Sequence, residues 1–147
     1  MTERLLSNAA PRPAAPWMDG LRRLYERLDA DLAKVPVKCD VCGRCCHFAD
    51  FDHVLYLSNL EAMYLCRMGV PAGTPAGACP FQDGPRCTAH PRRALGCRTF
   101  SCDKRHRDAL QALYEACHRE IKRLAEEAGV PWSYAPLAEQ IALMLDT

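Results

Sequence analysis

Large apolar residues recur at helical intervals over residues 17–35. Steps of three and four residues place them on one face of an amphipathic helix: Trp17, Leu21, Leu24, Leu28, Leu32 and Val35. Proline lacks the backbone N–H that a helix needs, so we expect Pro36 to end this helix.

The clearest helical pattern covers residues 103–128. Its apolar face consists of Leu110, Leu113, Tyr114, Cys117, Ile121 and Leu124. Gly129 and Pro131 predict the end of this helix. A last helix is expected to begin near Pro136 and to use Leu137, Ile141 and Leu145.

A shorter helix is predicted after Ser58. The sequence Ser58-Asn-Leu-Glu61 is a capping-box pattern, in which the serine accepts from the backbone and the glutamate reaches back to it. This helix should continue to about Met68, because Gly69 and Pro71 follow.

Two segments show no regular period. Residues 37–50 hold four cysteines, and residues 70–102 contain five prolines with glycines between them. A loop as long as the second one is unusual in a compact domain, and a metal held by its cysteines would hold it in place. We therefore predict a mainly α fold, a small helical domain whose long irregular cysteine-rich loops are organised around a metal centre. Residues 1–16 are expected to form a flexible arm, and residues 17–147 a single metal-binding domain with its motif core at 37–102 and C-terminal helices at 103–147.

Cysteine is the unusual component of this chain. The protein has 147 residues, 49% of them apolar and 25% charged, with a net charge of +1, which suits one globular domain. Ten cysteines in such a chain indicate either secreted disulfides or a metal site. The first 17 residues contain no apolar run of signal-peptide length, and no stretch is apolar for about 20 residues. We therefore expect a cytoplasmic protein with no membrane association, whose thiols are reduced or bound to metal.

Eight cysteines fall in two blocks outside the helical patterns: Cys39, Cys42, Cys45 and Cys46, then Cys79, Cys87, Cys97 and Cys102. Eight thiolates make two sets of four, the number that a tetrahedral zinc site or a cubane iron–sulfur cluster uses. In extended backbone the neighbours Cys45 and Cys46 point in opposite directions. They would then serve different metals, or only one of them would be a ligand.

The surroundings of these cysteines favour iron–sulfur over zinc. The C-x2-C-x2-C run and the Cys79-Pro80 pair resemble parts of bacterial ferredoxin spacing, in another order. Residues 86–107 carry a local charge of +6. Thiolate-bound centres are usually anionic, and guanidinium groups such as those of Arg93 and Arg98 can donate to sulfur. We predict a [4Fe–4S] cluster with zinc as the alternative, and nucleic-acid contact as another interpretation of the basic segment.

The other cysteines and the histidines have simpler interpretations. Cys66 and Cys117 lie within helical patterns, where cysteine behaves as a small buried apolar residue. Histidines near the cysteines could complete a Cys3His site, although each has an ordinary surface interpretation: His47, His53, His90 and His106. His118 lies beside an apolar helix face, and whether it is a ligand is left open. No nucleophile elbow, P-loop or dinucleotide-binding glycine pattern appears.

The motif residues resemble a known family. The run CDVCGRCC at 39–46, CPF at 79–81 and the C-x9-C-R-x-F pattern at 87–100 resemble the CxxCxxCC cysteine-cluster family, also called YkgJ-like or the zinc- or iron-chelating domain. Arg93 is in register with the family pattern, whereas Ala89, His90 and Ala94 replace its usual Ile, Tyr and Pro. The resemblance covers residues 37–102 and implies metal binding by the eight cysteines. A similar domain in flagellin lysine methylases is associated with an iron–sulfur cluster.

Three functions are compatible with these patterns. The leading hypothesis is a metal-binding cysteine-cluster protein, with an iron–sulfur cluster used in electron transfer or in support of a redox or protein partner. The second is a structural zinc module that contacts nucleic acid or an acidic protein. The third is a metal-dependent enzyme of unknown substrate, such as an oxidoreductase or a protein-modifying enzyme, which requires an open coordination position.

Overall fold

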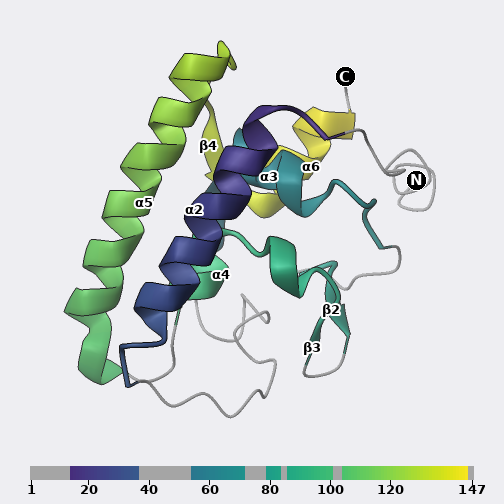
Figure 1. The fold of residues 1–147 in the computed structure, drawn as a ribbon. Helices are drawn as coiled ribbons and strands as arrows, with labels where there is room; N and C mark the ends of the chain where they lie inside the picture. The colour runs from purple at the N-terminus through teal and green to yellow at the C-terminus, as the bar shows by residue number, and fades with distance from the viewer. Residues whose placement is uncertain (1–13, 37–53, 72–78, 84–85, 101–103, 146–147) are drawn as a thin grey trace.

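The computed structural model describes residues 14–36, 54–71, 79–83, 86–100 and 104–145. In these residues the fold is mainly helical, as predicted (Figure 1). Two long helices, α2 (Trp17–Leu32) and α5 (Arg107–Ala128), lie side by side. The short helices α3 (Asn59–Leu65) and α4 (Leu95–Thr99) pack against them, and α6 (Leu137–Leu145) packs against α3. Strands β1 (Tyr56–Ser58) and β4 (Tyr134–Pro136) form one antiparallel pair, and β2 (Gln82–Asp83) and β3 (Arg86–Cys87) form another. No helix in the described ranges is both long and apolar enough to cross a membrane.

The two long helices enclose one apolar core, which we call the helical cluster. The predicted apolar face of α2 is buried here, together with residues of α3, α4 and α5: Leu21, Leu24, Tyr25, Leu28, Leu60, Leu95, Ile121 and Ala125. The predicted helix at residues 17–35 is confirmed, although it ends at Leu32, before Pro36.

The C-terminus of α5 and the N-terminus of α6 follow from local sequence signals. Gly129 has the left-handed conformation, with φ of 67°, that glycine adopts without strain at a helix C-terminus. The N–H of Val130 then donates to the carbonyl of Ala125 at 2.9 Å. Helix α6 begins directly after Pro136, as predicted.

The predicted capping box of α3 is present. The N–H of Glu61 donates to Oγ of Ser58 at 3.2 Å, and the N–H of Ser58 donates to Oε2 of Glu61 at 2.9 Å. The helix ends at Leu65, three residues earlier than about Met68, and Gly69 follows with φ of 100°. Glu61 is only 1% exposed, which the capping box alone does not require.

The described parts of residues 70–102 are more ordered than the irregular loop predicted from the sequence. They contain the β2–β3 hairpin, the 3-10 turn η3 (His90–Arg92) and α4. Each element has five residues or fewer, too few for a hydrophobic period to be visible in the sequence.

A second apolar core, which we call the cysteine-lined cluster, lies between these short elements, β1, α3 and α6. Its buried members are Leu55, Leu57, Ala62, Leu65, Cys66, Val70, Cys79, Phe81, Ala89, Ala94 and Leu137. Cys87, Cys97, Ile141 and Met144 pack against it and are partly buried.

Candidate metal centre

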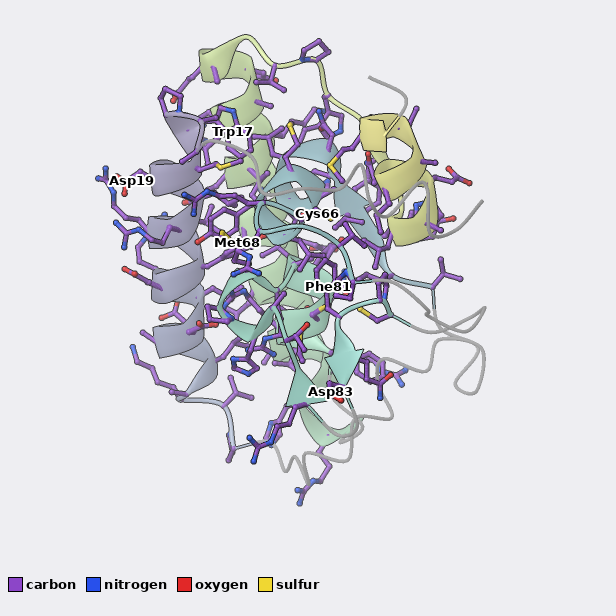
Figure 2. All side chains as sticks on the ribbon, turned by 90° about the vertical axis from the view of Figure 1, so that its right-hand side faces the viewer. Trp17, Asp19, Cys66, Met68, Phe81 and Asp83 are labelled. Carbon is purple, nitrogen blue, oxygen red and sulfur yellow. The ribbon has the colours of Figure 1, made fainter. Side chains whose placement is uncertain are left out.

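The β2–β3 hairpin carries Cys79 and Cys87. The N–H of Gln82 donates to the carbonyl of Cys79 at 3.1 Å, and Gln82 pairs with Cys87 across the hairpin. Phe81 is inside the molecule and Asp83 lies at the outer end of the hairpin (Figure 2). This turn brings two cysteines separated by seven residues to the same apolar cluster, Cys79 with 6% of its surface exposed and Cys87 half-buried.

Cys97 reaches the same cluster from α4. The N–H of Cys97 donates to the carbonyl of Ala94 at 3.1 Å, which closes the first turn of this five-residue helix. At the start of the helix, the N–H of Leu95 donates to Oε1 of Glu61 at 2.8 Å. The helix also passes close to β1, because a Cβ atom on Gly96 would lie 2.7 Å from Leu55. Glycine at position 96 therefore permits the contact that brings Cys97 to the cluster.

The guanidinium group of Arg98 lies next to this helix in the interior. Its Nε donates to the carbonyl of Arg93 at 2.7 Å, one terminal nitrogen to the carbonyl of Pro91 at 2.6 Å, and the other to Oδ2 of Asp29 at 2.7 Å. The group also lies 4.1 Å from the centre of the Tyr25 ring. The side chain is 2% exposed, so Arg98 is a buried arginine that links α2 to the segment before α4.

The other arginines near the site also donate to oxygen atoms. Nε of Arg93 donates to the carbonyl of His90 at 3.0 Å, and Nε of Arg92 donates to the carbonyl of Leu65 at 3.3 Å. Donation from Arg93 or Arg98 to a metal-bound sulfur stays a prediction, since the bonds described here go to backbone carbonyls and to Asp29.

Three residues of this arrangement were not predicted to have a role near the site. Tyr25 and Asp29 belong to α2, and the capping residue Glu61 receives two further donors, the Tyr25 hydroxyl at 3.3 Å and the Leu95 N–H. Burial raises the pKa of Tyr25 well above 10.0, and the negative charge of Glu61 raises it further. Tyr25 shows a signal in the sequence, since it lies four residues after Leu21 on the apolar face, but Asp29 shows none.

Cys66 and Cys117 have the packing that their helical patterns predicted. Cys66 is buried in the cysteine-lined cluster, directly after α3, and Cys117 packs against the helical cluster. Burial, followed by the charge of Glu120, raises the pKa of Cys117 to about 11. A thiol with such a pKa is protonated at neutral pH and is a poor metal ligand.

The described histidines differ in their surroundings. His118 packs among aromatic rings of the helical side, 5.8 Å from Tyr114 and 4.9 Å from Tyr134 between ring centres. His90 lies in η3, where desolvation and then the charges of Arg93 and Arg98 lower its pKa. Their role as ligands stays open.

Five of the eight predicted cysteine ligands lie outside the described residues: Cys39, Cys42, Cys45, Cys46 and Cys102. The same holds for His47 and His53. Within the described ranges, no group of three or more cysteine, histidine or acidic side chains is arranged to hold a metal ion. The three described candidates, Cys79, Cys87 and Cys97, do share one cluster, and thiols of this kind suit zinc and iron–sulfur centres.

Comparisons with protein-family models, with curated proteins and with solved structures found no match for this chain.

Proposed function

We propose that this protein binds an iron–sulfur cluster through its motif cysteines and that it serves in electron transfer or in support of a redox partner. The observation that carries the proposal is the meeting of Cys79, Cys87 and Cys97 at one apolar cluster, although they span 19 residues of chain. Short elements separated along the chain bring them there, whereas Cys66, which shares the cluster, is placed there directly by the end of α3. Cys39, Cys42, Cys45, Cys46 and Cys102 would complete the ligand set.

The surroundings of these thiols suit a redox centre. Aliphatic side chains and Phe81 surround the three cysteines, and such an apolar shell limits solvent access and shifts the reduction potential of a bound cluster. A bound cluster would supply one-electron chemistry, while the chain would hold it and shield it from water. The proposal includes membership of the CxxCxxCC cysteine-cluster family and a cytoplasmic location, where the thiols stay reduced.

The nucleic-acid alternative receives less support from the basic segment. Arg98 is buried and paired with Asp29, and Arg92 and Arg93 donate to backbone carbonyls of their own chain. Phosphate contact requires accessible cations. Arg86, Arg105 and Arg107 are exposed. This leaves a smaller basic surface than the local charge of +6 indicated.

Anaerobic purification tests the proposal. The expected protein is brown, contains iron and acid-labile sulfide, and loses its visible absorption on oxidation. A colourless protein with stoichiometric zinc would reject the iron–sulfur cluster and support the structural zinc module. A protein with neither iron nor zinc would reject metal binding altogether.

A pair of serine variants assigns the ligands. Cys97→Ser should lower the metal content, because a hydroxyl is a poor ligand for a thiophilic metal. Cys117→Ser is the matched control, since the same atom changes at a cysteine of the helical cluster. Equal metal content in the two variants would show that Cys97 is not a ligand.

A further inference from the structure

Two buried charged residues contact α4: Glu61, which accepts from Leu95, and Arg98, which directly follows Cys97 in the chain. We propose that Arg98 is a positioning residue for Cys97: from α2, through Asp29 and Tyr25, it holds α4 so that the thiolate of Cys97 points to the metal centre. This inference rests on the proposed metal binding and adds how one ligand is held in place.

Helix α4 cannot hold this position by its own hydrogen bonds. A helix of five residues lies far below the length at which an isolated helix is stable. Two charged side chains, one of them from α4 itself, supply the missing contacts. The Glu61 carboxylate accepts from the first residue of the helix, Leu95, and the Arg98 guanidinium binds the carbonyls of Pro91 and Arg93 just before it.

The conformation of Arg98 depends on the hydrogen-bond acceptors and the countercharge that its buried guanidinium group can reach. With 2% of the side chain exposed, the guanidinium needs acceptors within the protein. Asp29 supplies the countercharge from α2, and its own side chain is 49% exposed, so this pair reaches the surface. The Tyr25 ring covers the guanidinium face at 4.1 Å.

The planar guanidinium is essential to this arrangement. Three nitrogens of Arg98 donate in three directions, to Arg93, Pro91 and Asp29. The single ammonium group of lysine cannot reach all three acceptors in this geometry, although it keeps the charge. Arg98→Lys therefore separates orientation from charge.

Cys97 is close to the residues that hold Arg98. The N–H groups of Cys97 and Arg98 both donate to the carbonyl of Ala94, each at 3.1 Å. The backbone of the two residues is thus held at one point. If the hydrogen bonds of Arg98 weaken, Cys97 should therefore lose its position to a greater extent than Cys79 and Cys87, which lie at the hairpin.

Site-resolved alkylation of the metal-loaded full chain tests this inference. The anaerobically purified protein is treated with iodoacetamide, and the labelling rate of each cysteine is read by mass spectrometry. In Arg98→Lys, we expect Cys97 to be labelled on the order of tenfold faster than in the wild type, because changing a residue that supports a metal ligand typically weakens metal affinity by at least about tenfold. Labelling of Cys79 and Cys87 should increase less.

Control variants isolate the effect. Arg27→Lys makes the same exchange in the Arg27–Glu120 pair of the long helices, at 3.0 Å, and should leave labelling of Cys97 unchanged. Asp29→Asn keeps an oxygen acceptor for Arg98 but removes the countercharge, so its labelling of Cys97 should lie between the wild type and Asp29→Ala, which should resemble Arg98→Lys. Should Arg98→Lys fail to fold, the contrast between Asp29→Asn and Asp29→Ala decides the matter.

The outcomes separate this inference from the proposed function. Wild-type protein without metal would reject the proposed function. Wild-type protein with metal and a protected Cys97, together with unchanged Cys97 protection in Asp29→Ala and in any folded Arg98→Lys, would overturn the positioning role alone. Equal acceleration at Cys79, Cys87 and Cys97 would also overturn it, because it would indicate general loosening.

Discussion

The helical cluster and the cysteine-lined cluster are built from different residues. The first is filled by leucines, Ile121 and the Tyr25 ring, from helices of 16 and 22 residues and their neighbours. The second contains alanines and sulfur atoms among its leucines, with Phe81 as the largest fully buried side chain, and several of its elements have five residues or fewer.

The two clusters are therefore stabilised by different interactions. Burial of large apolar side chains contributes about 25 cal/mol per Å², which suffices where long helices carry a continuous apolar face. Alanines and cysteines bury less apolar area, so short elements around them need other support. The buried charges of Glu61 and Arg98 supply part of that support, and under the proposed function a bound metal would supply more.

Removal of the metal should have the largest effect and should be confined to the cysteine-lined cluster. Metal binding at cysteine sites is coupled to folding and is worth on the order of 10 kcal/mol. Amide hydrogen exchange with and without a chelator should show lost protection at residues 79–100 and retained protection in α2 and α5. Uniform loss of protection would mean that the two clusters fold as one unit.

Leu28→Ala should disrupt the helical cluster instead. Leu28 is fully buried, and removal of a buried leucine costs about 2–5 kcal/mol through lost transfer energy and the cavity left behind. Urea denaturation measures the loss, while metal content per folded protein should be unchanged. A parallel loss of metal would contradict the independence of the two regions.

Gly96→Ala should have a smaller, local effect. The added methyl group would lie 2.7 Å from Cδ1 of Leu55, a side chain that is only 2% exposed, and such overpacking costs about 1–3 kcal/mol. We expect a lower melting temperature and weaker metal retention, because either the buried Leu55 side chain or α4 must shift. Gly20→Ala is the matched control: its methyl group would meet the flexible end of Leu124 at 3.1 Å, and it should leave metal retention unchanged.

The smallest effect concerns Cys117 and alkaline pH. Its folded pKa of about 11 exceeds the usual 9.0, so the unfolded chain loses this proton first. The stabilising contribution is therefore complete below pH 9.0 and is lost as pH rises to about 11. The free energy of unfolding of the wild type relative to Cys117→Ala should decrease between pH 9.0 and about 11, as measured by denaturation at several pH values. A decrease centred near pH 7 would contradict the burial of the Cys117 thiol.

The parts of the fold that could be predicted are those with long local signals. The apolar faces of α2 and α5 extend over several turns, and the capping box at Ser58 and the glycine at 129 act within a few residues of themselves. The site was predicted as a set of cysteines, and for Cys79, Cys87 and Cys97 the fold brings that set to one cluster.

The sequence by itself determined the two long helices, the capping box of α3 and the C-terminus of α5, because periodicity and capping act between near neighbours. Only the tertiary structure decided that the Glu61 carboxylate accepts from the N–H of Leu95 at the start of α4 and that Asp29 pairs with Arg98. It also decided that the hairpin and α4 pack against the same apolar core. The physical reason is distance along the chain: Asp29 and Arg98 are 69 residues apart, so no local pattern records that the buried charge of Arg98 requires the carboxylate of Asp29.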